Sequence, residues 1–154
     1  MMKVRFLLLS ITCCLFFYSC NKLDVFEKDT TIPQYEWSST FRPSFDFDII
    51  DTTSTYRLYI VLRHTDAYRY NNIWLNIGSK FPGDTMSYQK LELGLGNDAT
   101  GWEGSGMDDI WEVRKPIAKG AFKIGKYTFS IAQIMRENPL PNIMSIGMRM
   151  EKMN

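Results

Sequence analysis

The chain has 154 residues, a formal net charge of +1 and 14% aromatic residues. This length indicates a single domain once a leader is removed, and it is enough to bury a core without disulfide bonds. The near-neutral charge gives no sign of the strongly basic surface that binds phosphate groups, which excludes typical nucleic-acid-binding proteins.

The first 19 residues have the organisation of a secretion signal. Lys3 and Arg5 precede an apolar run over residues 6–17, and the small Ser19 stands directly before Cys20. A charged start followed by a short apolar stretch is typical of signal peptides, and the run is shorter than the roughly 20 apolar residues of a membrane-spanning helix. We predict that residues 1–19 are a lipoprotein signal peptide and that Cys20 carries the lipid, palmitate included. A signal cut elsewhere or an uncleaved anchor is the alternative.

The cysteine content agrees with this prediction. Cys13 and Cys14 leave with the signal, so the mature chain keeps only Cys20. A single remaining cysteine in a secreted protein needs an explanation, and lipidation is one. The mature chain therefore has no intramolecular disulfide and no thiolate metal site, and several acyl chains on one residue would attach it firmly to a membrane.

Most of the mature chain alternates between apolar and polar residues. Residues 20–36 lack sustained periodicity and are predicted to be a lipidated tether, and the domain is predicted to span residues 37–154. Strands are predicted at residues 45–49, 56–63, 73–77, 88–95, 110–113, 127–131 and 146–150. The first two are expected to form a hairpin, and residues 133–138 a helical turn. About 7–8 short strands favour an all-β, antiparallel β-sandwich that is jelly-roll-like, although the pattern does not separate a sandwich from a barrel.

The order of several motifs resembles the GldH family of gliding-motility lipoproteins. After the signal that ends at Cys20, Trp37 precedes the Phe-x-Phe-x-Ile strand at residues 45–49. The other matching segments, at residues 56–64, 68–75, 101–106, 125–129, 135–136 and 146–151, cover nearly the whole domain.

The resemblance implies a non-enzymatic cell-envelope component that acts with the gliding-motility machinery and the linked type 9 secretion apparatus. It implies a lipid-anchored location on the outer membrane, facing the periplasm. The implied partners are other Gld lipoproteins and envelope machinery proteins, with no cofactor and no nucleic acid. In a cell that does not glide, such a protein would serve secretion or envelope assembly.

Two loops are the candidate partner-binding segments, at residues 68–74 and 101–109. Both mix aromatic, polar and glycine residues, as the centres of interfaces often do. The candidate partner-binding residues are Arg63, His64, Tyr68, Tyr70, Asn72, Trp74 and Trp102. The same rings, with Trp111, could instead form a sugar-binding platform, so a carbohydrate-binding envelope lipoprotein is the alternative. Aromatic residues also commonly fill β cores.

Catalytic and metal-binding patterns are weak. His64 is the only histidine and has no second metal ligand at a recognisable spacing, so a structural role is favoured over a metal or a proton shuttle. The acids Asp98, Glu103, Asp108 and Asp109 are interpreted as a solvated turn, with calcium binding or paired carboxylates for glycoside hydrolysis as alternatives. Ser105 lacks a nucleophile elbow. We predict no catalytic residue, no metal and no enzymatic activity.

Overall fold

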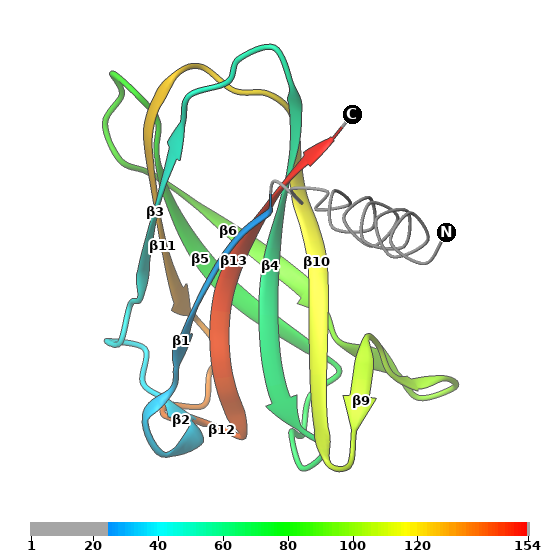
Figure 1. Cartoon of the computed structure of the whole chain (residues 1–154). Helices are drawn as coiled ribbons and strands as arrows, with labels where there is room; N and C mark the ends of the chain where they lie inside the picture. The colour runs from blue at the N-terminus through cyan, green and yellow to red at the C-terminus, as the bar shows by residue number, and fades with distance from the viewer. Residues whose placement is uncertain (1–24, 154) are drawn as a thin grey trace, which may run out of the picture.

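Two antiparallel sheets pack face to face and share one apolar core (Figure 1). The computed structural model describes residues 25–153. Sheet 1 has the strand order β1 (Val25–Thr31), β13 (Ile143–Met153), β4 (Thr55–Thr65), β10 (Ile110–Ala121) and β9 (Ser105–Met107). Sheet 2 has the order β3 (Ser44–Ile49), β11 (Gly125–Gln133), β5 (Asn72–Lys80) and β6 (Ser87–Gly94).

Shorter elements close the sandwich at one end. β2 (Glu36–Trp37) pairs with β12 (Leu140–Pro141), and β7 (Gly96–Asn97) pairs with β8 (Gly101–Trp102). A 3₁₀ turn, η2 (Pro33–Tyr35), precedes β2. The predicted all-β sandwich is confirmed, and these short strands raise the number of strands above the predicted 7–8.

The strand order is that of a jelly roll. The chain passes between the two sheets at every connection of the long strands except β5 to β6, which is the arrangement of two Greek keys in one double sheet. The predicted hairpin of the first two strands is wrong, because β3 pairs with β11 whereas β4 lies between β13 and β10. Alternation shows which residues face a core, but it does not show which strand lies alongside.

The core forms where the alternating apolar faces of the sheets meet. In β3, β4 and β5 the apolar residues at every second position are buried, and Val61 of β4 is buried as well. The core residues from the two sheets include Phe45, Phe47, Leu58, Ile60, Leu62, Ile73, Leu75, Ile77, Phe129, Ile131, Ile146 and Met148.

The domain begins earlier than the sequence indicates. Residues 25–36, which the sequence analysis placed in the tether, form β1, η2 and the start of β2. β1 is an edge strand with few apolar residues, and its order comes from pairing with β13, from Val25 opposite Glu151 to Thr31 opposite Ser145. Ile32, directly after it, is fully buried. The signal peptide and Cys20 lie outside the described residues.

Two further segments differ from the prediction. Residues 133–138 form no helical turn. The buried Gln133 side chain holds this segment instead, because its Nε2 donates to the Trp37 carbonyl (3.1 Å) and its Oε1 accepts from the Met135 amide (2.7 Å). β10 continues to Ala121, well beyond the predicted strand at residues 110–113, since Pro116 and a bulge before Ala118 interrupt the alternation.

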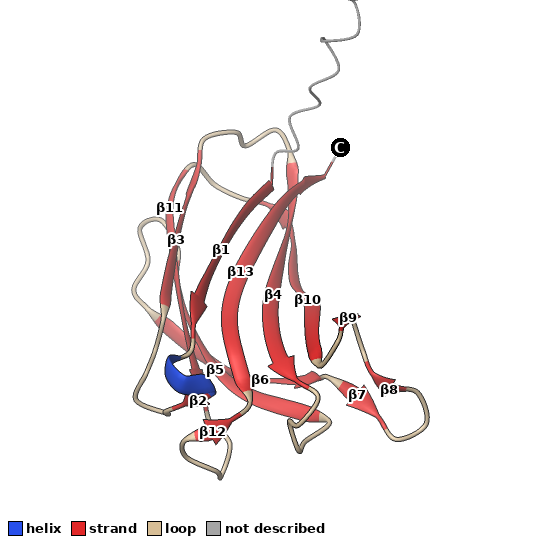
Figure 2. Cartoon of the chain, turned by 60° about the horizontal axis from the view of Figure 1, so that its bottom comes forward, coloured by secondary structure: helices blue, strands red, loops and turns tan. Residues whose placement is uncertain are grey.

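The two ends of the sandwich differ (Figures 1 and 2). The upper end consists of the loops at residues 50–54, 81–86 and 122–124, beside the start of β1 and the end of β13. The lower end includes residues 66–71 and the segment at residues 95–104, which carries β7 and β8. Within residues 25–153, no helix has the length and apolar character needed to cross a membrane.

Candidate partner-binding site

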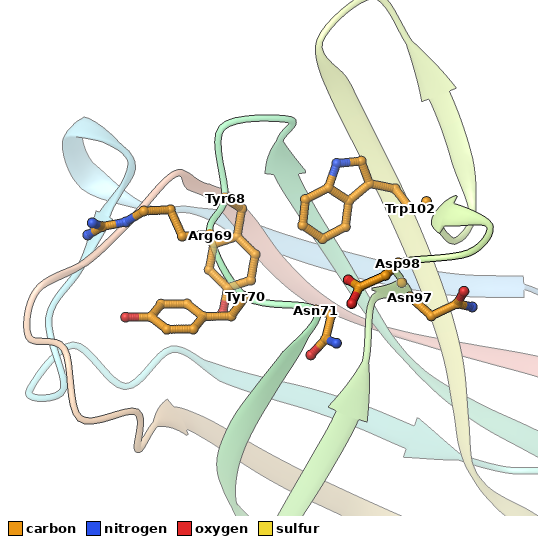
Figure 3. A pocket seen from close by; sticks show the side chains of 9 residues that line it. Tyr68, Arg69, Tyr70, Asn71, Asn97, Asp98 and Trp102 are labelled. Carbon is orange, nitrogen blue, oxygen red and sulfur yellow. The ribbon is translucent and has the colours of Figure 1, made fainter.

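A cavity of about 310 Å³ opens at the lower end, where the loop between β4 and β5 meets the β7–β8 ribbon (Figure 3). We name it the Trp102 pocket. Its lining brings together residues from both predicted loops. The lining residues are Tyr68, Arg69, Tyr70, Asn71, Gly96, Asn97, Asp98, Gly101 and Trp102.

Backbone hydrogen bonds hold the first loop. The Tyr68 amide donates to the Thr65 carbonyl (3.1 Å), and the Tyr68 hydroxyl donates to the Asn72 carbonyl (3.0 Å). The carbonyl of Asn71 then accepts from the amides of Leu95 (2.7 Å) and Gly96 (3.2 Å). These bonds join the two walls of the pocket directly, so its shape is set by the fold.

The glycines of the second loop allow close backbone approach. A Cβ at Gly96 would lie 2.6 Å from the Gly101 carbonyl oxygen, and one at Gly104 would lie 2.1 Å from the Glu112 carbonyl oxygen. Gly101 and Gly104 also have positive φ angles of 75° and 97°, a region that favours glycine. The glycine-rich segment therefore folds back tightly enough to turn Trp102 toward the tyrosines.

An aromatic stack lies beneath the pocket. His64 is fully buried, with ring centroids 4.6 Å from Trp102 and 5.6 Å from Tyr68, and Tyr68 is 5.6 Å from Tyr70. The His64 Nδ1 lies 2.8 Å from the Thr65 carbonyl oxygen, whereas Nε2 has no hydrogen-bond partner among the described residues. Burial lowers the pKa of His64, so the ring is a neutral floor for Trp102 rather than part of the exposed surface.

Arg63 does not take part in the pocket. It lies on the opposite face of β4, where its Nε is 2.7 Å from the Glu112 carboxylate. Because β4 is flanked by β13 and β10, neither Arg63 nor His64 lies at a sheet edge. Arg63 and His64 therefore lie on opposite faces of sheet 1 and do not share one surface, and a partner-binding role for either residue stays a prediction.

The pocket has an unequal charge distribution. Glu137 accepts from both Arg69 (2.5 Å) and the Tyr70 hydroxyl (2.8 Å), and its hydrogen bond raises the pKa of Tyr70. Figure 3 shows the Arg69 side chain directed away from the Asp98 carboxylate, which faces the space between Trp102 and Asn71. Among the described residues, no ion pair or hydrogen bond engages that carboxylate. The surrounding segment, residues 94–109, contains four acids and no lysine or arginine.

A second cavity, of about 360 Å³, lies on the other side of Tyr70. It is lined by Tyr70, Trp74, Ile134, Met135 and Arg136. Trp74 is 40% exposed on the outer face of β5, and its backbone amide and carbonyl contact the Met135 sulfur and the Ile134 amide. Tyr70 thus lines both cavities. The sequence analysis missed the second one because it assigned residues 133–138 to a helical turn.

The remaining candidate residues are used elsewhere. Asn72 donates to the Glu92 carboxylate at 2.6 Å, Glu103 pairs with Lys115, and the Trp111 ring covers Gly106. Within residues 25–153, no group of three or more histidine, cysteine or acidic side chains is arranged to hold a metal ion. Ser105 is exposed on β9, opposite Glu112 in the register.

Comparison with known proteins identifies similar lipoproteins. A family model described as GldH lipoprotein matches residues 24–150. The chain is 32% identical over 145 residues to a gliding motility lipoprotein GldH homolog of Christiangramia forsetii, with 88% of each chain covered. It is 28% identical over 142 residues to the gliding motility lipoprotein GldH of Flavobacterium johnsoniae, with 88% of this chain and 89% of that protein covered.

Among solved structures, VP2 in the subviral particle of infectious bursal disease virus matches 85% of this chain and 33% of its own, with 12% sequence identity. The TM-score of this match is 0.34.

Proposed function

The chain belongs to the GldH lipoprotein family, and from this premise we propose that it is a non-enzymatic part of the gliding-motility and type 9 secretion-associated machinery. It is attached to the outer membrane by lipid on Cys20, faces the periplasm and acts by protein–protein contact. Its partners are other Gld lipoproteins and envelope machinery proteins.

One observation carries the contact proposal: the two predicted loops meet around a preformed, partly exposed aromatic pocket at the lower end. Tyrosine and tryptophan in such pockets commonly dominate binding energy. Asp98 faces the same space, and its segment is acidic. Ring faces attract cations, so the surface suits a partner that presents a lysine or arginine side chain.

A binding role also fits the state of the titratable groups. The His64 ring is buried and its Nδ1 is engaged with a backbone carbonyl, so it is not available to exchange protons with a bound molecule. Burial and the neighbouring Tyr70 and Glu137 raise the pKa of Tyr68, which keeps its hydroxyl protonated and committed to Asn72. The groups nearest the pocket therefore stabilise its shape.

The test is cross-linking of the lipidated protein in intact cells, followed by mass spectrometry of the captured proteins. We expect wild-type protein to capture Gld lipoproteins, and Trp102→Ala to reduce this capture by roughly tenfold or more, as for a central interface aromatic. Tyr88→Ala is the matched control, because Tyr88 is 61% exposed on β6 and lines neither cavity.

The same variants examine the carbohydrate alternative. The pocket also carries the amide side chains of Asn71 and Asn97 beside its rings, a combination that can bind sugars. If Trp102→Ala abolished retention on envelope glycan while protein capture stayed intact, the protein would instead be a carbohydrate-binding lipoprotein.

A further inference from the structure

We propose that the upper end of the sandwich lies against the bilayer that holds the lipid anchor, with its apolar loop tips in the lipid headgroup region. This inference rests on lipid attachment at Cys20, as given in the proposed function. It assigns a membrane-contact surface to the loops at residues 50–54, 81–86 and 122–124.

The chain between the lipid and the domain is short. Cys20 lies five residues before Val25, where β1 begins at the upper end (Figure 1). A fully extended chain covers at most about 3.6 Å per residue, so these residues span no more than roughly 18 Å. The attachment keeps the upper end, and not the lower end, next to the headgroups.

The tips of the upper loops are apolar. Ile50 is 84% exposed, Ile124 is 64% exposed and Phe81 is 41% exposed. Each of the three upper loops therefore presents one large apolar side chain to its surroundings. Apolar side chains that enter the headgroup region strengthen the attachment of a surface-bound segment.

The loops present these side chains in fixed positions. The Asp51 carboxylate accepts from the Thr53 amide (2.8 Å) and from the Ser54 hydroxyl (2.7 Å), and the Asp51 carbonyl accepts from the Tyr56 hydroxyl (2.9 Å). These bonds order the loop that follows Ile50. Its exposure is therefore part of the folded structure.

The other two loops support each other. A Cβ at Gly125 would lie 2.8 Å from the Pro82 side chain, so these loops are in close approach. Phe81 packs on Tyr127 at 5.6 Å, and Tyr127 packs on Phe122 at 5.3 Å. This ring cluster fixes the loop at residues 122–124, in which Ile124 is exposed.

Charge agrees with this orientation. Lys80 directly precedes Phe81, and Lys123 directly precedes Ile124, so basic groups flank two of the apolar tips. Lysines near a surface are attracted by anionic lipid headgroups. The upper loops also carry Asp84 and Asp51, and Asp51 is paired with Lys152 (2.9 Å). At the lower end, the charged residues within 94–109 are all acids, although Arg69 lies beside them.

The mature chain allows a direct test, because its only native cysteine is the lipidated Cys20. Single cysteines at Ile50→Cys and Ile124→Cys are labelled with an environment-sensitive fluorophore in the full lipidated protein. The protein is reconstituted in vesicles of phosphatidylethanolamine and phosphatidylglycerol. Met107→Cys is the matched control, as Met107 is an apolar side chain 75% exposed on β9.

We expect the labels at positions 50 and 124 to be quenched by nitroxide-bearing lipids and shielded from aqueous iodide, at least severalfold more than the label at position 107. Equal iodide access at all three positions overturns the proposal, as does equal protection of all three. Mass spectrometry of the same samples shows whether Cys20 carries the lipid, and partner capture by Trp102→Ala is measured separately. These two measurements distinguish a failure of membrane contact from a failure of the lipid anchor or of the contact function.

Discussion

His64 shows how one buried polar side chain can couple the pocket to the core. It lies on the inner face of the central strand β4, and Trp102 and Tyr68 pack on its ring. Its ring Nδ1 lies 2.8 Å from the Thr65 carbonyl oxygen, and the ring Nε2 has no partner in residues 25–153. Burial removes water from a charged imidazole at this position, so the pKa of His64 is lowered.

This lowered pKa predicts a specific pH dependence of stability. Below about pH 6.5 the unfolded chain binds a proton on His64 while the folded chain does not, so the free energy of unfolding falls as the pH falls toward the folded pKa. The loss is at most about 1 kcal/mol between pH 6.5 and 5.5. Urea unfolding at these two values checks it.

His64→Phe is the comparison for this measurement, because it keeps a ring against Trp102 and removes the titrating group. Since His64 is the only histidine, the variant should show almost no change in stability over this range. An equal decrease in both proteins would mean that His64 is not the group responsible.

At the scale of elements, the β7–β8 ribbon determines where Trp102 lies. The ribbon has only two residues in each strand and depends on the approach of Gly96 to the Gly101 carbonyl. The Asn97 side chain accepts from the amides of Ala99 (3.0 Å) and Thr100 (2.9 Å) and so closes the turn between the strands. Small residues here are a requirement of packing rather than a sign of a mobile loop.

Replacing one glycine of this segment tests that conclusion. We expect Gly96→Ala to lower the free energy of unfolding by about 1–3 kcal/mol, as overpacking does, and to reduce partner capture by displacing Trp102. Gly94→Ala is the control, because a Cβ there meets no atom within 4 Å. Its effect should stay within about 0.5 kcal/mol. Equal effects of the two changes, measured by thermal unfolding, would contradict the packing argument.

Strands were predicted best from the sequence where alternating apolar residues pack into the core. β3, β4, β5, β6, β11 and β13 each have apolar residues on one face and were placed within a few positions. β1 was missed because it is a polar edge strand that is ordered by β13, a strand more than 100 positions later. The end of β10 was missed because Pro116 and the bulge disrupt the period.

The candidate site was predicted in part for a similar reason. Tyr68, Tyr70 and Trp102 were singled out because large rings among turn residues are visible in sequence, but that their two loops lie side by side was not predicted. Asn97 and Asp98 were not singled out for the pocket, because their place depends on the fold-back at Gly96. The inward position of His64 and outward position of Arg63 follow from strand alternation, but the central place of β4 in sheet 1 required the topology.

At the scale of the whole molecule, the jelly roll separates two surfaces. The upper end carries the apolar tips, and the lower end carries the aromatic pocket, with the core between them (Figure 1). Mutational effects at distant sites without shared partners are usually additive. The two surfaces should therefore respond independently to substitution.

A combination of variants examines this independence in cells. We expect Ile50→Ser together with Ile124→Ser to leave the capture of Gld lipoproteins within about twofold of wild type, while Trp102→Ala reduces it to the same degree in either background. Capture by cross-linking and mass spectrometry is the measurement. A reduction by the two serine substitutions as large as that by Trp102→Ala would show that the upper end contacts the partner.

The pairing of β1 with β13 has a mechanical consequence for an anchored protein. The chain enters from the anchor side at Val25 and runs down β1 toward the lower end, antiparallel to β13 along seven residue pairs. With the proposed lipid attachment and partner, a pull between membrane and partner would act along this strand, whereas its interstrand hydrogen bonds lie perpendicular to it. The hydrogen bonds of the β1–β13 ladder would then be loaded together in shear, instead of breaking one after another. The edge strand β1 would carry the tension between the anchor and the rest of the domain.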